Sequence, residues 1–161
     1  MNAVAVREFL SATVRSDQPS VGRLLDLCEQ NYRRVLLLVP DLRLWSGARE
    51  PIEDAGVQYT FHVDEQTPYT TALRMICRMA TAAGARSRET LEIHLRIYHD
   101  ARQAEVTFLA CDGVLCRAFS AQSPDRRGLR LKWAVNLFLE KWLRWQLARD
   151  RRFGDPPPAA A

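Results

Sequence analysis

The sequence predicts an α+β domain: a five-stranded antiparallel sheet covered on one face by N-terminal helices and one long C-terminal helix. Three observations support this fold class. Apolar and polar residues alternate over several short stretches between positions 57 and 119, which is the period of half-buried strands. Helix-period patterns flank these stretches on both sides. The strands follow one another without a connection long enough for a parallel crossover, so neighbouring strands are expected to be antiparallel.

Helices are expected before the sheet. Ala3–Val14 has the pattern of a short helix, and the polar break at Ser16–Ser20 follows it. Ser20 is a suitable N-cap for a second helix that runs to Val39 and ends at Pro40. Apolar residues at helical spacing predict the buried stripe of this helix: Leu24, Leu25, Cys28, Tyr32, Val35, Leu36 and Val39.

Loops and a first hairpin come next. Residues 41–56 are expected to form a loop that can hold a turn of helix. Val57–Val63 alternates in period 2 and pairs most simply with Tyr69–Arg78 across a turn at Asp64–Pro68. The small residues of Ala80–Arg88 then predict another loop.

The second hairpin has the clearest pattern in the chain. Leu91–Tyr98 and Gln103–Ala110 alternate in period 2 on either side of a short polar link, which predicts two strands that each bury one face. The Asp112-Gly113 pair is typical of a two-residue type I′ turn, and it predicts a fifth strand over Val114–Phe119.

The apolar match across this second hairpin predicts its register. Tyr98 is expected to face Gln103, which places Arg96 opposite Glu105. The remaining expected pairs are Ile97 with Ala104, Leu95 with Val106, His94 with Thr107 and Ile93 with Phe108. Arg96 and Glu105 would then form a cross-strand ion pair. Alternatively, the planar fork of Arg96 grips an anionic group.

The last helix is expected over Leu129–Arg149, with an apolar stripe broadened by Ala134 and Leu139. The stripe itself comprises Leu131, Val135, Phe138, Trp142 and Trp145. The pattern therefore divides the chain into an N-terminal extension at 1–17, a single α+β domain at 18–150 and a disordered Pro/Ala tail at 151–161.

Composition narrows the class of protein. The chain has 161 residues, of which 47% are hydrophobic and 26% charged, as is usual for one soluble globular domain. The longest apolar run, Val35–Val39, is too short to cross a bilayer, and the first residues lack the pattern of a signal peptide, so we expect a cytoplasmic protein. The four cysteines lack metal-ligand spacing and are expected to be reduced and packed. No metal or cofactor is expected.

The tip of the second hairpin is the best candidate functional spot, because it gathers an aromatic ring, a titratable ring and a carboxylate. The residues proposed to bind a ligand or a partner are Arg96, Tyr98, His99, Asp100, Arg102, Glu105 and Tyr69. Arg96 and Tyr69 are expected to wall a pocket between the sheet and the helices. Alternatively, Asp100 stabilises the turn, since the side chain of aspartate often accepts a hydrogen bond from the backbone N–H two residues further on.

Three function classes remain open. The pattern favours a non-enzymatic module that binds a protein or another ligand, since GxSxG, P-loop and GxGxxG motifs are absent and no catalytic residue is assigned. A hydrolase or transferase would use His99 with Asp100 or Glu105. A nucleic-acid-binding protein, which the net charge of +4 permits, would use the basic last helix and its tryptophans: Arg126, Arg127, Arg130, Lys132, Trp133 and Trp145.

Three stretches of this sequence carry a family resemblance. They are Leu27–Tyr32 with Pro40 after it, Arg96–Ala101 with Ala104–Val106 after it, and Asn136–Leu139 with Trp142-Leu143 after it. Tyr69–Thr71 after Glu65 also fits. Together they resemble a bacterial family of small cytoplasmic proteins, the YqiB-like family, which is a domain of unknown function. The resemblance covers Val21–Leu147, and it implies no activity.

The chain departs from this family before its last helix. Where the family carries a tyrosine- and asparagine-rich loop and an acidic, lysine-containing helix start, this chain reads Phe119–Arg127 followed by Arg130–Lys132. Only Pro124 and Lys132 match. We therefore expect the role of that loop to be altered in this chain.

Overall fold

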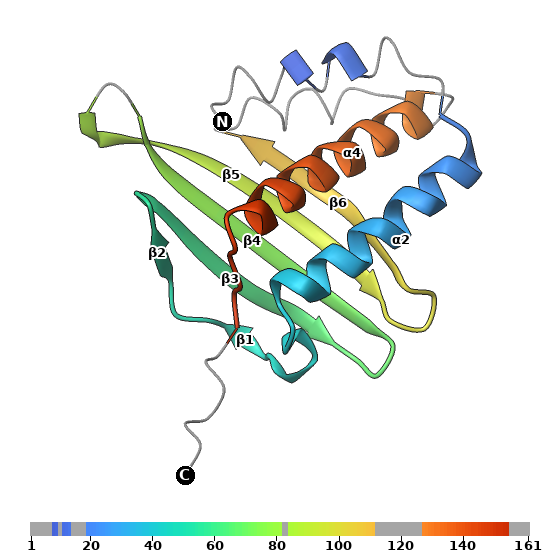
Figure 1. Cartoon of the computed structure of the whole chain (residues 1–161), viewed down its shortest axis with the longest axis horizontal. Helices are drawn as coiled ribbons and strands as arrows, with labels where there is room; N and C mark the ends of the chain where they lie inside the picture. Colours follow the sequence, from blue (N-terminus) through green and yellow to red (C-terminus); the bar gives the residue numbers. More distant parts are fainter. Residues whose placement is uncertain (1–7, 10, 14–18, 82–83, 112–126, 155–161) are drawn as a thin grey trace.

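A computed structural model describes residues 8–9, 11–13, 19–81, 84–111 and 127–154, and it confirms the α+β class. The described elements are α2 (Val21–Leu38), the 3-10 helix η1 (Leu42–Leu44), β1 (Gly47–Ala48), β2 (Ile52–Asp54), β3 (Val57–Gln66), β4 (Thr70–Thr81), β5 (Gly84–Tyr98), β6 (Gln103–Cys111) and α4 (Arg127–Ala148). The described strands form one antiparallel sheet in the order β1-β3-β4-β5-β6, with β2 also paired to β3. Helices α2 and α4 lie side by side across one face of it (Figure 1).

Helix α2 begins and ends almost as the sequence predicts. The Ser20 side chain accepts a hydrogen bond from the Arg23 backbone N–H at 3.2 Å, which is the expected N-cap. The helix ends at Leu38 because the residue before a proline is disfavoured in the helical region, and Val39 precedes Pro40. The predicted stripe is wrong at Leu25, which is exposed, because the buried face turns toward Asn31.

The sheet is more extensive than the sequence predicts. The loop expected at Ala80–Arg88 is wrong: Ala80 pairs with Arg88 and Thr81 with Gly84, so β4 and β5 continue as a long hairpin. The ladder persists past the last apolar pair because its hydrogen bonds come from the backbone. The strand expected over Val114–Phe119 and its Asp112-Gly113 turn lie outside the described residues.

The segment 41–56 contains the turn of helix that was allowed for it, as η1, and also two short strands that the sequence did not predict. Strands β1 and β2 both pair with β3 on the side away from β4. Ala55 and Gly56 connect β2 to β3 with φ of 50° and 76°, the two positive values that a type I′ turn requires. The sequence signal for this turn is weak, because Ala55 occupies the first turn position, where asparagine or aspartate is usual.

The register of β5 and β6 is partly as expected. Tyr98 lies opposite Gln103, and the three pairs that follow, down to Leu95 with Val106, are confirmed. The next two are wrong, because a register shift leaves Thr107 unpaired and puts Phe108 opposite His94. A β-bulge of this kind adds one residue to a single strand, and a pattern that counts in twos cannot detect it.

The core lies between the helices and the inner face of the sheet. Alternate residues of the central strands are buried there, including Tyr59, Phe61, Leu73, Met75, Ile93, Leu95 and Ile97. Before α2, residues 8–9 and 11–13 are helical within the helix expected at Ala3–Val14. The Phe9 ring there packs on Phe138 of α4. Within the described ranges, no helix combines enough length with enough apolar character to span a bilayer.

One buried asparagine joins both long helices to β6. Asn136 of α4 accepts a hydrogen bond from the Val106 backbone N–H through its side-chain Oδ1, at 3.0 Å. Its backbone carbonyl accepts a second bond from Nδ2 of Asn31 on α2, at 3.1 Å. Because buried polar groups are costly when unpaired, this arrangement fixes the two helices against the strand.

The chain continues as packed structure after α4, where the tail was expected. Phe153 is buried against Tyr59 and Phe61, with ring centroids 4.9 and 5.0 Å away, and its backbone N–H donates to the Leu38 carbonyl at 2.6 Å. Arg151 is also buried and forms an ion pair with Asp54. The predicted tail therefore starts too early, since an aromatic ring at 153 completes the core. Residues 155–161 lie outside the described residues.

We predict that Phe153→Ala lowers the free energy of unfolding by about 3 kcal/mol, the usual cost of deleting a buried phenylalanine ring. Urea unfolding followed by circular dichroism measures this change. Leu37→Ala is the matched control, because Leu37 is 54% exposed, and we expect a change within about 0.5 kcal/mol. Equal effects of the two substitutions would show that the Phe153 ring contributes nothing to the core.

Candidate functional site

The predicted site residues begin at the turn between β5 and β6. Arg102 has a φ of 53°, in the left-handed region that allows the chain to reverse. The exposed Asp100 side chain accepts a hydrogen bond from the Ala101 backbone N–H at 2.9 Å, one residue further on instead of the expected two. Asp100 therefore shapes the turn and still presents its carboxylate to solvent.

His99 is not at an exposed tip, as the sequence suggested, but is only 8% exposed. Its backbone N–H donates to the Tyr69 carbonyl at 2.8 Å, and its ring Nε2 lies 2.8 Å from Thr71 Oγ1. The ring also packs edge-on against Tyr32 of α2, with centroids 6.0 Å apart. His99 therefore connects the β5–β6 turn to the neighbouring β3–β4 turn and to α2.

The hydrogen-bond pattern sets the proton position on His99. The Thr71 hydroxyl donates its one proton to Gln66 Oε1 at 2.9 Å, so Thr71 Oγ1 accepts from His99 and Nε2 carries the ring proton. His99 Nδ1 is buried and has no hydrogen-bond partner among the described residues. Burial lowers the pKa of His99, the positive charge of Arg43 lowers it further, and Asp100 acts in the opposite direction.

A third segment meets these two turns. The Arg43 guanidinium of η1 donates to the Pro68 carbonyl at 2.9 Å, and Thr67 Oγ1 accepts the backbone N–H of Thr70 at 2.9 Å. The residues beside this junction expose apolar groups: Leu44 is 85% exposed and Tyr69 is 66% exposed. We call this surface the hairpin corner and define it by Arg43, Leu44, Tyr69, Asp100 and Arg102.

Other predicted residues lie on the face of the sheet opposite the helices, which we call the open face. Arg96 lies across from Glu105, but its ion pair is with Glu65, at 3.6 Å. Glu105 accepts from the Tyr98 hydroxyl at 3.3 Å but reaches toward the helices, where it pairs with Lys132 of α4 at 3.6 Å. Burial and the neighbouring Glu105 carboxylate raise the pKa of Tyr98.

The pocket expected between the sheet and the helices is therefore not walled by Arg96 and Tyr69. Arg96 points to the open face because it alternates with the buried Leu95 and Ile97, and Tyr69 sits on an exposed turn. Strand alternation separates the predicted set into two groups, one at the hairpin corner and one on the open face. His99 lies beneath the corner.

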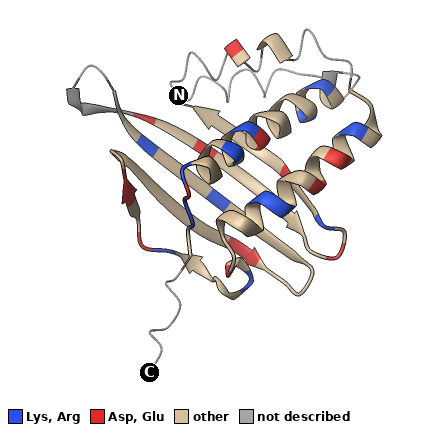
Figure 2. Ribbon diagram, viewed as in Figure 1, with Lys and Arg blue, Asp and Glu red and all other residues tan. Residues whose placement is uncertain are grey.

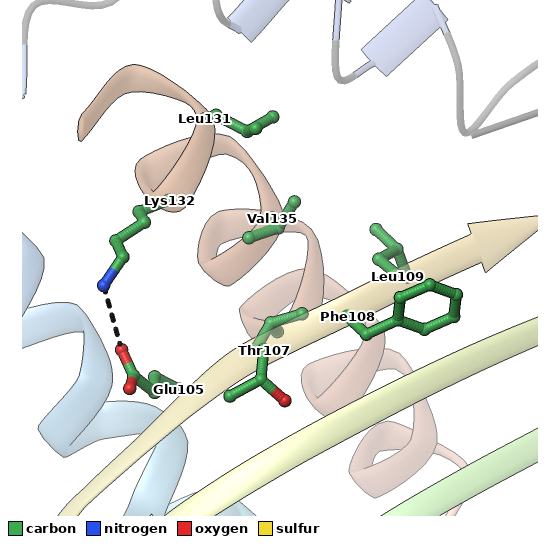
Figure 3. A pocket seen from close by; sticks show the side chains of 8 residues that line it. Glu105, Thr107, Phe108, Leu109, Leu131, Lys132 and Val135 are labelled. Atoms are coloured by element: carbon green, nitrogen blue, oxygen red, sulfur yellow. Dashed lines mark ion pairs between the residues drawn. The ribbon is translucent and has the colours of Figure 1, made fainter. Parts of the chain in front are cut away.

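A pocket of about 420 Å³ lies where α4 crosses β6 (Figure 3). Leu131 and Val135 line its helix side, and Phe108 and Leu109 line its strand side. The Lys132–Glu105 ion pair stands at one end of it. The pocket thus combines apolar walls with one charged pair.

The residues proposed to bind nucleic acid are dispersed. Trp133 is buried beneath the Arg23 guanidinium, which lies 4.9 Å from its ring, so it offers no face for a base to stack on. Trp145 is partly exposed, but Arg149 and Arg151 lie over its ring.

Among the basic residues proposed for the same role, Lys132 is paired with Glu105. Arg130 is partly exposed, Arg126 lies outside the described residues, and the side chain of Arg127 is not described. Figure 2 shows both charge signs along the two long helices.

The described residues give little support to nucleophilic or metal chemistry. Asp100 bonds Ala101 and His99 bonds Thr71, so the two are not paired as base and orienting carboxylate. Burial raises the pKa of the Cys28 thiol to about 11 and that of Cys77 to about 12, which keeps both protonated and unreactive. The described part of the chain contains no group of three or more metal-ligating side chains placed to hold an ion.

Sequence reasoning missed residues that the fold brings to these surfaces. Arg43 and Leu44 lie in a segment that the sequence predicts as a loop, and Glu65 lies in a predicted turn, so the pattern places neither segment near the second hairpin. The detectable signal is the group of apolar residues Leu42, Leu44 and Trp45 inside a segment that otherwise reads as a loop. Only the pairing of β3 with β4 and of β4 with β5 shows that Glu65 and Arg96 lie on opposite sides of Ala72.

The stretches that carry the family resemblance meet in space. Asn31 of the first bonds Asn136 of the third, and Tyr32 of the first contacts His99 of the second. The fold and site thus define a small α+β protein in which two helices cover one face of an antiparallel sheet and anchor a rigid corner of turns.

The comparison with known proteins gives the family. A family model described as a protein of unknown function (DUF1249) matches residues 34–152. The chain is 31% identical over 134 residues to the uncharacterized protein YqiB of Escherichia coli strain K12, covering 81% of this chain and 90% of that relative. Relatives of the same name from Escherichia coli O157:H7 and O6:H1 match to the same extent. No solved structure matches. The chain therefore belongs to the YqiB-like DUF1249 family.

We predict that the stability of the protein falls as the pH drops below about 6.5, the ordinary pKa of histidine. Because the folded state lowers the pKa of His99, the unfolded chain binds a proton first and gains free energy from it. The loss of stability grows until the pH reaches the pKa that His99 has in the folded protein. Above the pKa of the unfolded chain there is no loss. Nuclear magnetic resonance of the His99 ring, with urea unfolding at several pH values, measures both effects.

The matched variant for this prediction is Arg43→Gln, which removes the positive charge that lowers the pKa of His99. We expect the titration of the His99 ring to move to higher pH in this variant. His94→Gln is the control, because His94 lies on the open face and pairs with Glu92. A His99 ring that titrates at or above its ordinary pH would contradict the buried, neutral state.

Proposed function

We propose that the protein is a non-enzymatic binding module that contacts a partner protein through the hairpin corner. The observation that carries this proposal is the pair of exposed apolar side chains, Leu44 and Tyr69, on neighbouring turns that are fixed to one another. A contiguous exposed apolar patch is typical of a contact site for another protein, whereas single exposed apolar residues are ordinary. Tyrosine and arginine, both present here, are the residues most often found at the energetic centre of such contacts.

The corner is pre-organised for binding. The Arg43–Pro68 bond joins η1 to the β3–β4 turn, and the bond from the His99 N–H to the Tyr69 carbonyl joins that turn to the next. Because these segments are already ordered, a partner would not have to restrict their motion on binding. Asp100 and Arg102 add one charge of each sign, which would select a partner of matching polarity.

A protein partner fits this surface better than a small molecule does. The cavities at the β6 edge, beneath Trp145, beside Trp45 and on the open face are all lined by residues other than those of the hairpin corner. Small ligands bind in concave sites, whereas this corner is built from projecting turns. The buried, hydrogen-bonded His99 supports the non-enzymatic part of the proposal, since a substrate could not reach its ring directly.

We predict that Leu44→Ser/Tyr69→Ser reduces capture of a specific partner from native lysate by about tenfold or more, as loss of a contact centre would. Tagged wild type and variant are compared by quantitative mass spectrometry. The captured protein is then purified, and its affinity for both forms is measured by calorimetry. Since both side chains are exposed, the variant should unfold within about 0.5 kcal/mol of wild type.

Leu25→Ser is the control, because Leu25 is also an exposed leucine but lies on the first half of α2. It should retain the partner. Equal retention by all three forms would place the contact elsewhere. Recovery of nucleic acid by wild type and variant alike, lost at high salt, would favour the nucleic-acid-binding class instead.

A further inference from the structure

A second surface lies on the open face, where a hollow of about 300 Å³ opens between charged side chains. We call it the open-face hollow and define it by Asp64, Glu65, Ala72, His94, Arg96 and Thr107. A single small residue, Ala72 of β4, forms the floor of the hollow. Ala72 pairs with Glu65 of β3 on one side and with Arg96 of β5 on the other. The long side chains of these neighbours stand above the Ala72 methyl group and leave space over it.

Two β-bulges flank the hollow, one in β3 and one in β6. In β3 the register shifts between Val63 and Glu65, so Asp64 is the extra residue. In β6 the shift leaves Thr107 unpaired. Bulges redirect side chains and are common next to binding and catalytic sites. The bulge in β3 places two successive carboxylates at this level of the sheet, where regular pairing would place one.

The charged groups around the hollow differ in how close their ion-pair partners are. Asp64 lies 2.5 Å from Arg74 and 2.7 Å from His62, and His94 lies 2.7 Å from Glu92. Glu65 and Arg96 meet only at 3.6 Å, and their side chains are 51% and 43% exposed. An exposed pair at this separation contributes little to stability, so a ligand can displace it at small cost.

We propose that the open-face hollow binds a small zwitterion of the α-amino-acid class. Arg96 would receive the carboxylate, because its planar guanidinium matches a carboxylate in two parallel hydrogen bonds. Glu65 would receive the ammonium group in place of Arg96. A zwitterion is the ligand that replaces both partners at once, whereas a simple anion would leave Glu65 without its cation.

The test is calorimetric titration of the intact protein with the twenty common amino acids, each up to about 10 mM, which detects even weak binding. We expect saturable binding of at least one amino acid. Arg96→Gln and Glu65→Gln should each weaken it by about tenfold or more, the loss expected for one charge-assisted hydrogen bond. The N-acetyl and carboxamide derivatives of that amino acid should also bind more weakly, since each lacks one of the two charges.

Two further variants keep the test decisive. Arg78→Gln removes a cation of the open face outside the hollow and should leave binding unchanged. Ala72→Phe fills the hollow without removing a charge and should abolish binding, while circular dichroism and thermal unfolding confirm that each variant is folded. The proposal is overturned if no amino acid binds, or if binding survives in Arg96→Gln and Glu65→Gln. Neither result bears on the hairpin corner, whose residues are separate.

Discussion

The position of Asn136 is the constraint on which the rest of the structure depends. Its side chain accepts a backbone N–H of β6 and its carbonyl accepts the Asn31 side chain, so one residue joins the sheet to both long helices. With α2 held in this way, Tyr32, the next residue along, meets the ring of His99. The hairpin corner is therefore linked through consecutive residues of α2 to this hydrogen-bonded joint. Removal of the Asn136 side chain would leave the Val106 N–H without this partner in the buried interior, which is costly.

Strand alternation explains why the predicted site residues do not form one site. Tyr98 and His99 are neighbours in sequence, yet Tyr98 reaches Glu105 on the open face while His99 turns inward to Thr71. The inner group acts as an anchor, with a buried ring that holds two turns together. The outer residues, by contrast, keep charged and hydroxyl groups available to solvent. A cluster that is compact in sequence is thus divided between a buried structural contact and polar groups exposed to solvent.

Much of the fold follows from period-2 alternation and helix signals: the Ser20 cap, the central strands and the register near Tyr98 are all predictable. Other features depend on information that no local pattern holds. The bulges at Asp64 and Thr107 interrupt the two-residue alternation of their strands. The burial of His99 results from the packing of α2 over the turn. Phe153 looked like part of a Pro- and Ala-rich tail, but the core has room for one more ring beside Tyr59 and Phe61. In each case tertiary contacts overrode composition.

The open face raises the question of why so many charges lie on one side of a sheet. Exposed ion pairs contribute little to stability one by one, so stability alone does not account for them. Charge along a sheet surface does discourage stacking against another sheet, and the close Asp64–Arg74 and Glu92–His94 pairs suffice for that purpose. The Glu65–Arg96 pair differs, because it is loose and spans an alanine where two bulges interrupt the regular ladder. Close pairs serve that purpose as they stand, whereas a loose pair over a hollow is the arrangement that a ligand can displace.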